Sequence, residues 1–180
     1  MPNFGRVSEI PDYIVLKYHR DLTGRRHEIW FRRGFLLIFL AFVVVALLNV
    51  FGQRPDTLRA ASAAASLELY SPAHIRGGLL YEARFRVTAK RELKKAFLVL
   101  APGWLEGQSV NTIEPSPVSE ASRNGRLSLE LGHIPAGESF LLYMQFQVNP
   151  TNIGAHSHDV ELDDGNRRLL SIHRTVTIFP

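Results

Sequence analysis

The chain has 180 residues, no cysteine and a formal net charge of +4. The absence of cysteine excludes a disulfide framework, a thiolate metal site and a cysteine nucleophile. The positive charge is confined to the N-terminal part: residues 1–34 hold seven basic and four acidic side chains, whereas residues 60–180 hold twelve of each. A nucleic-acid footprint would need a basic surface on the folded domain, so we expect no nucleic-acid partner.

One long apolar stretch follows the basic N-terminal part. Residues 35–51 are seventeen residues without a charge, and Asn49 is their single polar side chain. Because a charge at the bilayer centre is costly, this composition predicts a single transmembrane helix. Seventeen helical residues reach about 25 Å, slightly less than the hydrocarbon core. We therefore place the segment at residues 29–52, with Trp30 at the interface and Arg32 and Arg33 reaching the headgroups. The alternative is a buried helix of a soluble domain.

The charges around this stretch predict its orientation. Seven Lys and Arg residues precede it, and only Arg54 and Arg59 follow it before Ala65. By the positive-inside rule, residues 1–28 form a cytoplasmic segment in contact with anionic lipid, and the chain after about residue 55 is exported. A charged leader of more than thirty residues is not typical of a cleavable signal peptide, so we expect an uncleaved anchor. Seventeen Arg against four Lys indicate a GC-rich genome and hence a bacterial plasma membrane.

The hydrophobic period changes to two after residues 53–65, which we interpret as a stalk. Alternating or continuous apolar runs, each typical of a strand, occupy residues 66–70, 81–89, 96–101, 127–131, 140–148 and 170–178. Turn sequences such as Asn124-Gly125 separate them. Seven or eight short antiparallel strands in residues 66–180 predict an all-β sandwich.

Two segments of this region resemble a known class of module. Leu131 to Ser139, with its Pro-Ala-Gly-Glu-Ser ending, precedes the alternating strand 140–148, and Leu100 to Trp104 contains a Pro-Gly turn. This arrangement resembles the immunoglobulin-like repeats of bacterial surface proteins, here as one copy behind an N-terminal anchor. The resemblance implies an immunoglobulin-like fold for residues 66–180 and carries no implication about function.

Histidines near the C-terminus are candidate metal ligands. His156 and His158 fall on one face of a strand, and a two-residue turn at Asp164-Gly165 would place His173 opposite His156. Three imidazoles in one place would suit zinc or copper. This cluster would support a metal-dependent periplasmic protein.

The apolar pattern favours a different register for the same hairpin. A three-residue loop, 164–166, pairs Val160 with Leu170 and His158 with Ile172, which keeps the apolar side chains on one face. In this register His173 points away from the other two histidines. We therefore expect no metal and no other cofactor.

Clustered carboxylates offer a second candidate cation site. Asp159, Glu161, Asp163 and Asp164 could bind calcium at one end of a sandwich. Because the first three alternate along a strand, a solvated face is the favoured interpretation.

Signatures of catalysis are absent from the sequence: it contains no Gly-x-Ser-x-Gly elbow, no His-Glu-x-x-His and no phosphate-binding glycine loop. A dispersed Ser/His/Asp set stays open, but no small-molecule substrate is evident, and we expect a protein that is not an enzyme. Two features could bind a partner: Trp104 after the Pro-Gly turn, and the pair Arg84 and Arg86 on the polar face of a strand. The alternatives are a core position for Trp104 and a solvated face for the two arginines.

These observations lead to one main hypothesis about function and one alternative. The main hypothesis is a membrane-anchored accessory or scaffolding subunit of a larger membrane protein complex. The alternative is a surface module that binds cell-wall polymer through Trp104, Arg84 and Arg86.

Overall fold

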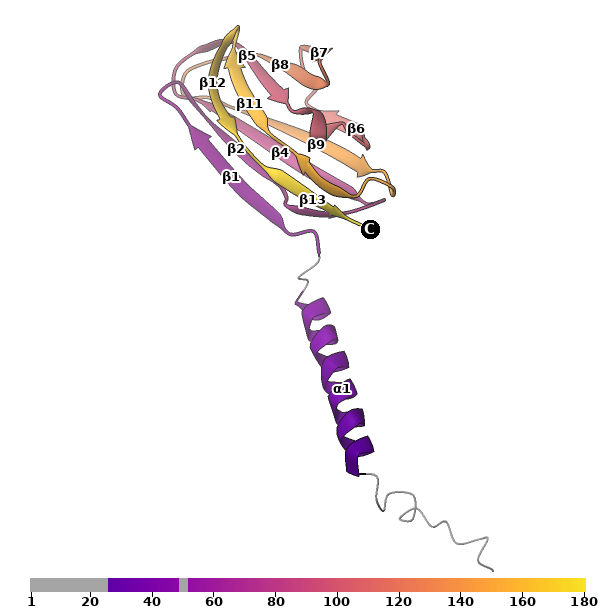
Figure 1. Cartoon of the computed structure of the whole chain (residues 1–180). Helices are drawn as coiled ribbons and strands as arrows, with labels where there is room; N and C mark the ends of the chain where they lie inside the picture. The colour runs from indigo at the N-terminus through magenta and orange to yellow at the C-terminus, as the bar shows by residue number, and fades with distance from the viewer. Residues whose placement is uncertain (1–25, 49–51) are drawn as a thin grey trace, which may run out of the picture. The chain divides into compact units, whose positions relative to one another are not determined.

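The structure is a computed structural model that describes residues 26–48 and 52–180 (Figure 1). The chain divides into two compact units, residues 1–50 and 51–180. Most of the predicted cytoplasmic segment, up to residue 25, lies outside the described residues.

The first unit contains the helix α1 (Arg26–Leu47). Its 22 residues reach about 33 Å, the thickness of a bilayer core. Its apolar side chains are exposed, Phe31 to 78%, and the Arg33 guanidinium lies 5.7 Å from the centre of the Trp30 ring. With a mean hydropathy of 2.1, α1 is long and apolar enough to cross a membrane. It is a candidate membrane anchor or signal sequence.

The helix boundaries differ from the predicted ones at both ends. Residues 26–28, assigned to the preceding segment, belong to α1, where Glu28 in the first turn complements the helix dipole. The helix ends at Leu47, and Gly52 lies in a bend, as its low helix propensity favours. Residues 49–51 of the predicted span lie outside the described residues.

The second unit is a β-sandwich with thirteen strands and one 3₁₀ helix in residues 52–180. In chain order these elements are β1 (Pro55–Ala61), β2 (Ala65–Pro72), β3 (His74–Arg76), β4 (Leu80–Ala89), β5 (Leu93–Leu100), η1 (Pro102–Trp104), β6 (Gln108–Glu114), β7 (Ser119–Arg123), β8 (Arg126–Ile134), β9 (Ser139–Val148), β10 (Gly154–Ser157), β11 (Val160–Asp164), β12 (Arg167–Ile172) and β13 (Thr175–Phe179). The predicted number of seven or eight was too low because several of these strands are short or largely exposed.

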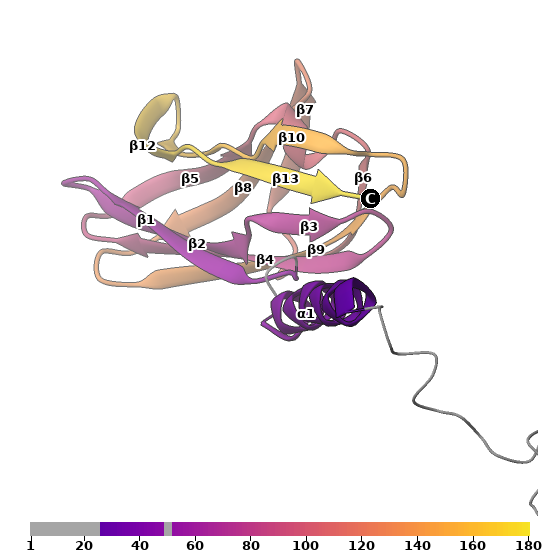
Figure 2. The ribbon, with the colours of Figure 1, turned by 60° about the horizontal axis from the view of Figure 1, so that its bottom comes forward.

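Three sheets make up the sandwich. Two of them have five strands, in the orders β1-β2-β4-β9-β6 and β12-β11-β5-β8-β7. The third has the order β10-β13-β3, and β13 runs between its two neighbours in Figure 2. Pairing is antiparallel except between β13 and β3. Because β3 follows β2 and β13 follows β12 directly, the small sheet extends strands of both large sheets.

Residues 53–65 do not form the predicted stalk, because β1 (Pro55–Ala61) occupies most of this segment. Residues 55–61 pair with 66–72 along the whole edge of the sheet. Leu58 and Ala60 pack against the core from this strand. The sequence concealed β1 because most of its side chains are exposed and only one of them is large and apolar.

The core lies between the two large sheets and follows the period of two. In β4, Tyr81, Phe85 and the other odd-numbered positions are buried, while Arg84 and Arg86 are exposed. In β9 the even-numbered positions from Leu142 to Val148, including Phe146, are buried, and Phe140 is half-buried. The alternation that predicted these strands therefore also identified their inward faces.

The β11–β12 hairpin has the predicted faces but a different register. Val160 pairs with Ile172 and not with Leu170. Residues 165 and 166 form a two-residue turn. The pairing register shifts between Leu162 and Asp163, and this shift brings Val160 and Leu162 opposite the apolar residues of β12. The register differs by two residues, and a two-residue shift leaves every side chain on its own face.

Candidate functional site

Trp104 lies in the core and is not available to a partner. Its backbone follows Gly103, where an added Cβ would lie 2.2 Å from the carbonyl oxygen of Ser157, so only glycine permits this approach. The indole is fully buried, and its Nε1–H donates to the Asp159 carbonyl at 3.2 Å. Its ring centre lies 5.3 Å from that of Phe146. The predicted interaction role of Trp104 is therefore wrong.

The three candidate histidines do not converge. His158 is fully buried, and the side chain of His173 is 76% exposed, which confirms the predicted inward and outward faces. His156 Nδ1 lies 3.9 Å from Glu106 Oε2. Within residues 26–48 and 52–180, no group of three His, Asp or Glu side chains is placed to hold a metal ion.

His158 belongs to a polar network that crosses the core. The Tyr81 hydroxyl donates to Gln108 Oε1 at 2.6 Å, and Gln108 Nε2 lies 3.1 Å from both His158 Nε2 and the Gly103 carbonyl. Because the amide donates, the ring nitrogen accepts and the imidazole is neutral. Burial, with His156 and Arg174 nearby, lowers the pKa of His158 to about 3. Burial also raises the pKa of Tyr81. The network joins the sheets through neutral groups.

A second polar group ties β13 to β2. Asp159 Oδ1 accepts the backbone N–H of Arg174 at 2.9 Å, and the Arg174 guanidinium donates to the Ser71 carbonyl at 2.7 Å. Burial alone would raise the pKa of Asp159, but hydrogen bonds from Arg174 and His173 hold it below its usual value. Burial lowers the pKa of Arg174. These contacts give both residues structural roles.

Three of the four candidate calcium ligands have separate protein partners. Glu161 forms ion pairs with Arg126 and Arg168, at 2.5 and 3.2 Å. Asp164 accepts the backbone N–H of Lys95 at 3.0 Å. Asp159 accepts from Arg174, and Asp163 has a buried Oδ1 without a hydrogen-bond partner. No three of these carboxylates are placed to hold a metal ion in the described part of the chain.

Ser171, His173 and Asp159 form a hydrogen-bonded row on the surface. His173 Nε2 lies 3.3 Å from Ser171 Oγ, and His173 Nδ1 lies 3.2 Å from Asp159 Oδ2. This is the connectivity of a catalytic triad. However, acyl transfer also needs a cleft that orients the substrate and donors that stabilise the oxyanion. The side chain of His173 is 76% exposed, so this row lies in open contact with water.

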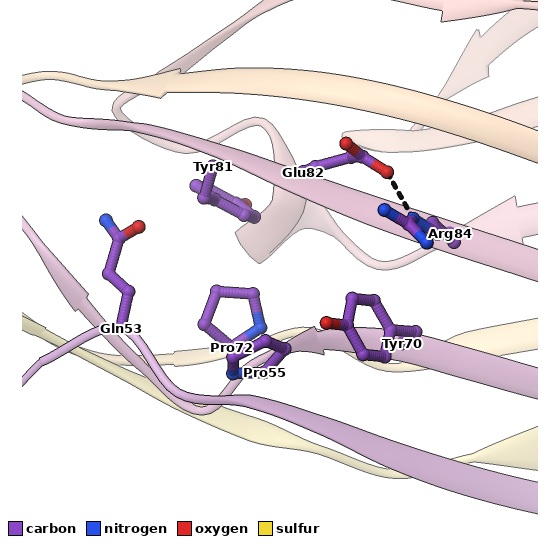
Figure 3. A pocket seen from close by; sticks show the side chains of 7 residues that line it. All are labelled: Gln53, Pro55, Tyr70, Pro72, Tyr81, Glu82 and Arg84. Atoms are coloured by element: carbon purple, nitrogen blue, oxygen red, sulfur yellow. Dashed lines mark hydrogen bonds and ion pairs between the residues drawn. The ribbon is translucent and has the colours of Figure 1, made fainter.

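The candidate binding surface is the outer face of the sheet β1-β2-β4-β9-β6, which we call the outer face. At its centre Arg84 of β4 stands between Tyr70 of β2 and Tyr143 of β9, its direct neighbours in the register. The Arg84 guanidinium lies 5.0 Å from the Tyr70 ring centre and 5.5 Å from that of Tyr143. Glu82 holds the same guanidinium from within β4 (Figure 3) and raises its pKa. Arg84 is therefore fixed, charged and about half exposed.

Two open hollows flank this centre. One, of about 210 Å³, is lined by Gln53, Pro55, Tyr70, Pro72, Tyr81, Glu82 and Arg84 (Figure 3). The other, of about 370 Å³, is lined by Glu82, Thr112, Glu114, Tyr143, Met144 and Gln145. Tyrosine and arginine are the residue types that are enriched at the centres of binding interfaces.

The basic residues after Arg86 do not extend this surface as one patch. Lys90 donates to the Ser62 carbonyl at 2.9 Å, and Lys95 pairs with Glu130 of the opposite sheet at 3.3 Å. The predicted candidates Arg84 and Arg86 are exposed on the outer face, as their polar positions in the alternating strand indicated. The tyrosines were missed because the sequence does not reveal that β2, β4 and β9 are neighbours.

No family model and no curated protein matches this chain. Among solved structures it is similar to the chitin-binding domain of a hyperthermophilic chitinase from Pyrococcus furiosus, with 14% identity over 61% of this chain and 96% of that chain and a TM-score of 0.37. It is also similar to BcpA, the major pilin subunit of Bacillus cereus, with 10% identity over 71% of this chain and 40% of that chain and a TM-score of 0.43. Both are too distant to support an argument about function.

Proposed function

We propose that the chain is a non-enzymatic accessory or scaffolding subunit of the bacterial plasma membrane. In this proposal α1 is an uncleaved single-pass anchor with the N-terminus in the cytoplasm. An immunoglobulin-like sandwich, residues 52–180, stands outside the membrane and binds another membrane protein or complex through the outer face.

The observation that carries this proposal is the fixed arginine at the centre of the outer face. Arg84 is held by Glu82 and by the rings of Tyr70 and Tyr143, so little side-chain entropy remains to be lost when a partner binds. The surrounding hollows are open, which suits a broad partner surface better than a small substrate. The polar side chains of Tyr81 and His158, in contrast, are buried, and both bond to Gln108.

Two experiments test the proposal. A reporter that is active only outside the cytoplasm should be active after Pro180 and silent before Met1, and the reverse result would contradict the orientation. Affinity purification of the full chain from mild detergent should then recover a stoichiometric membrane partner, and Arg84→Ala should lose it. Arg123→Ala, on the exposed β7 of the opposite sheet, is the matched control.

A polymer-binding role is the second candidate, and the tyrosines favour it. Exposed aromatic rings beside open hollows can pack on sugar rings, and Tyr143 is 38% exposed. Sedimentation of the protein with purified cell wall distinguishes the two roles. Binding that is lost in Tyr143→Ala and retained in Arg123→Ala would favour the polymer.

A further inference from the structure

Two charged side chains of the outer face have no ion pair within one molecule. Arg59 pairs with Glu68 and Arg84 pairs with Glu82 on this face. The side chains of Arg86 on β4 and Glu114 on β6 are exposed, and neither makes a hydrogen bond or ion pair with another described residue. Glu68 lies opposite Arg86 in the register, but its carboxylate pairs with Arg59. The face therefore presents one unpaired positive and one unpaired negative side chain.

The register shows why these two charges do not meet. Arg86 pairs with Leu141 of β9, and Glu114 pairs with Tyr143 of the same strand. The two charged residues are therefore separated by two strand spacings and one repeat along the strand, roughly 12 Å. Their midpoint falls on β9 between Leu141 and Tyr143.

We infer that a second copy of this chain covers the outer face, in a two-fold symmetric pair. A two-fold axis in the interface plane, passing over the midpoint on β9, places Arg86 of one copy opposite Glu114 of the other, twice. Leu141 and Tyr143 of both copies then lie close to the axis, with Arg86 and Glu114 on either side of them. Arg84, the register partner of Tyr143, also lies close to the axis, where Glu82 of its own copy pairs with its charge.

This inference rests on the proposed function, because the contact area requires the membrane anchor. Because the axis lies over β9, the two copies overlap mainly through β4, β9 and β6, roughly 300 Å² per copy. The total, roughly 600 Å², is below the size of a stable interface. Anchoring both copies in one membrane raises their effective concentration without any new contact. The pair should therefore form in the membrane, where cross-linking can trap it before any detergent is added.

Charge reversal in the full chain, expressed in its membrane, tests this inference. The chain has no cysteine, so Leu141→Cys supplies a single thiol near the axis. Packed sheets lie about 10 Å apart, so a bismaleimide of about that span is the suitable cross-linker and a disulfide is too short. Ala121→Cys, exposed on β7 of the opposite sheet, is the matched control.

The expected results follow from the pairing of unlike charges. In the Leu141→Cys background the cross-linked dimer should form, and Arg86→Glu or Glu114→Arg alone should reduce its yield at least about tenfold. The double reversal should restore the yield. Two single-reversal chains with different tags, expressed together, should cross-link to each other, because each supplies the charge that the other lacks. The Ala121→Cys control should give no dimer.

Several results would overturn the inference. They are no dimer from Leu141→Cys, single reversals without effect, no recovery in the double reversal, or cross-linking to a different protein. A chain that is found outside the membrane fraction would instead contradict the proposed function, because the anchor would then be absent. The two failures are therefore distinguishable in the same samples.

Discussion

Acidification should destabilise the sandwich through His158. The neutral ring accepts a hydrogen bond from the Gln108 amide, and its centre lies 4.4 Å from that of Trp104 in the core. Protonation at Nε2 would place two N–H donors against each other and put a charge near Arg174. The folded state therefore resists a proton that the unfolded state accepts.

The size of the effect follows from the pKa of His158. It falls from 6.5 in an exposed histidine to about 3 in the folded domain. The contribution of neutral His158 to the free energy of unfolding is fully present above pH 6.5, the pKa of this histidine in the unfolded chain. It is lost as the pH falls from 6.5 toward 3, because the unfolded state binds more protons in this interval. One pKa unit corresponds to about 1.4 kcal/mol, so the domain should lose about 2 kcal/mol between pH 7.5 and pH 5.

Urea unfolding of residues 52–180 at several pH values measures this loss. His158→Gln removes the titrating group, and its free energy of unfolding should be lower at pH 7.5 but nearly flat down to pH 5. His74→Gln, at an exposed position, should keep the slope of the original domain. Burial raises the pKa of Asp163, so this residue makes the free energy of unfolding rise as the pH falls, which is opposite to the effect of His158. Asp163 is present in both proteins, so its contribution cancels when the pH slope of the original domain is compared with that of His158→Gln. Equal slopes in the original domain and in His158→Gln would refute the reasoning.

Three further outcomes are expected. Phe85→Ala should lower the free energy of unfolding by about 3–5 kcal/mol in urea titrations, because it leaves a cavity in a fully buried position, and a loss below about 1 kcal/mol would contradict this placement. A domain that begins at residue 62 should be less stable than one that begins at residue 52 by more than about 2 kcal/mol, because it loses β1 and the burial of Leu58; equal stabilities would restore the stalk interpretation. A fluorophosphonate probe should not label Ser171, and purified protein should show no ester hydrolysis that Ser171→Ala removes; either signal would revive an enzymatic role.

The sequence predicted the inward faces of the strands well, because burial and the period of two are local properties. Phe85, Phe146 and His158 were assigned to the inward face from alternation alone, and all three are fully buried. The same rule failed for β1, where exposed polar and small residues carry no alternation of large apolar side chains. An edge strand of this kind is specified by its pairing partner and not by its own pattern.

The candidate site was harder to predict because it depends on the order of strands. Arg84 could be placed on an outward face, but Tyr70 and Tyr143 lie far from it in the sequence. They become its neighbours only because β4 pairs with β2 on one side and with β9 on the other. Trp104 illustrates the opposite error: a large aromatic residue after a Pro-Gly turn looks exposed until the close backbone approach at Gly103 is known.

The alternation of inward and outward side chains along the strands also explains where a binding site can lie in this domain. His158 and Trp104 occupy inward positions, where hydrogen bonds and ring contacts between the sheets use their chemistry. Arg84 and Arg86 occupy outward positions, and Arg86 has no partner in the described part of the chain. Because the inward side chains are buried between the sheets, the proposed binding role uses outward side chains. The outer face is where such side chains combine aromatic rings, a fixed cation and unpaired charges, so a partner should recognise the sandwich there.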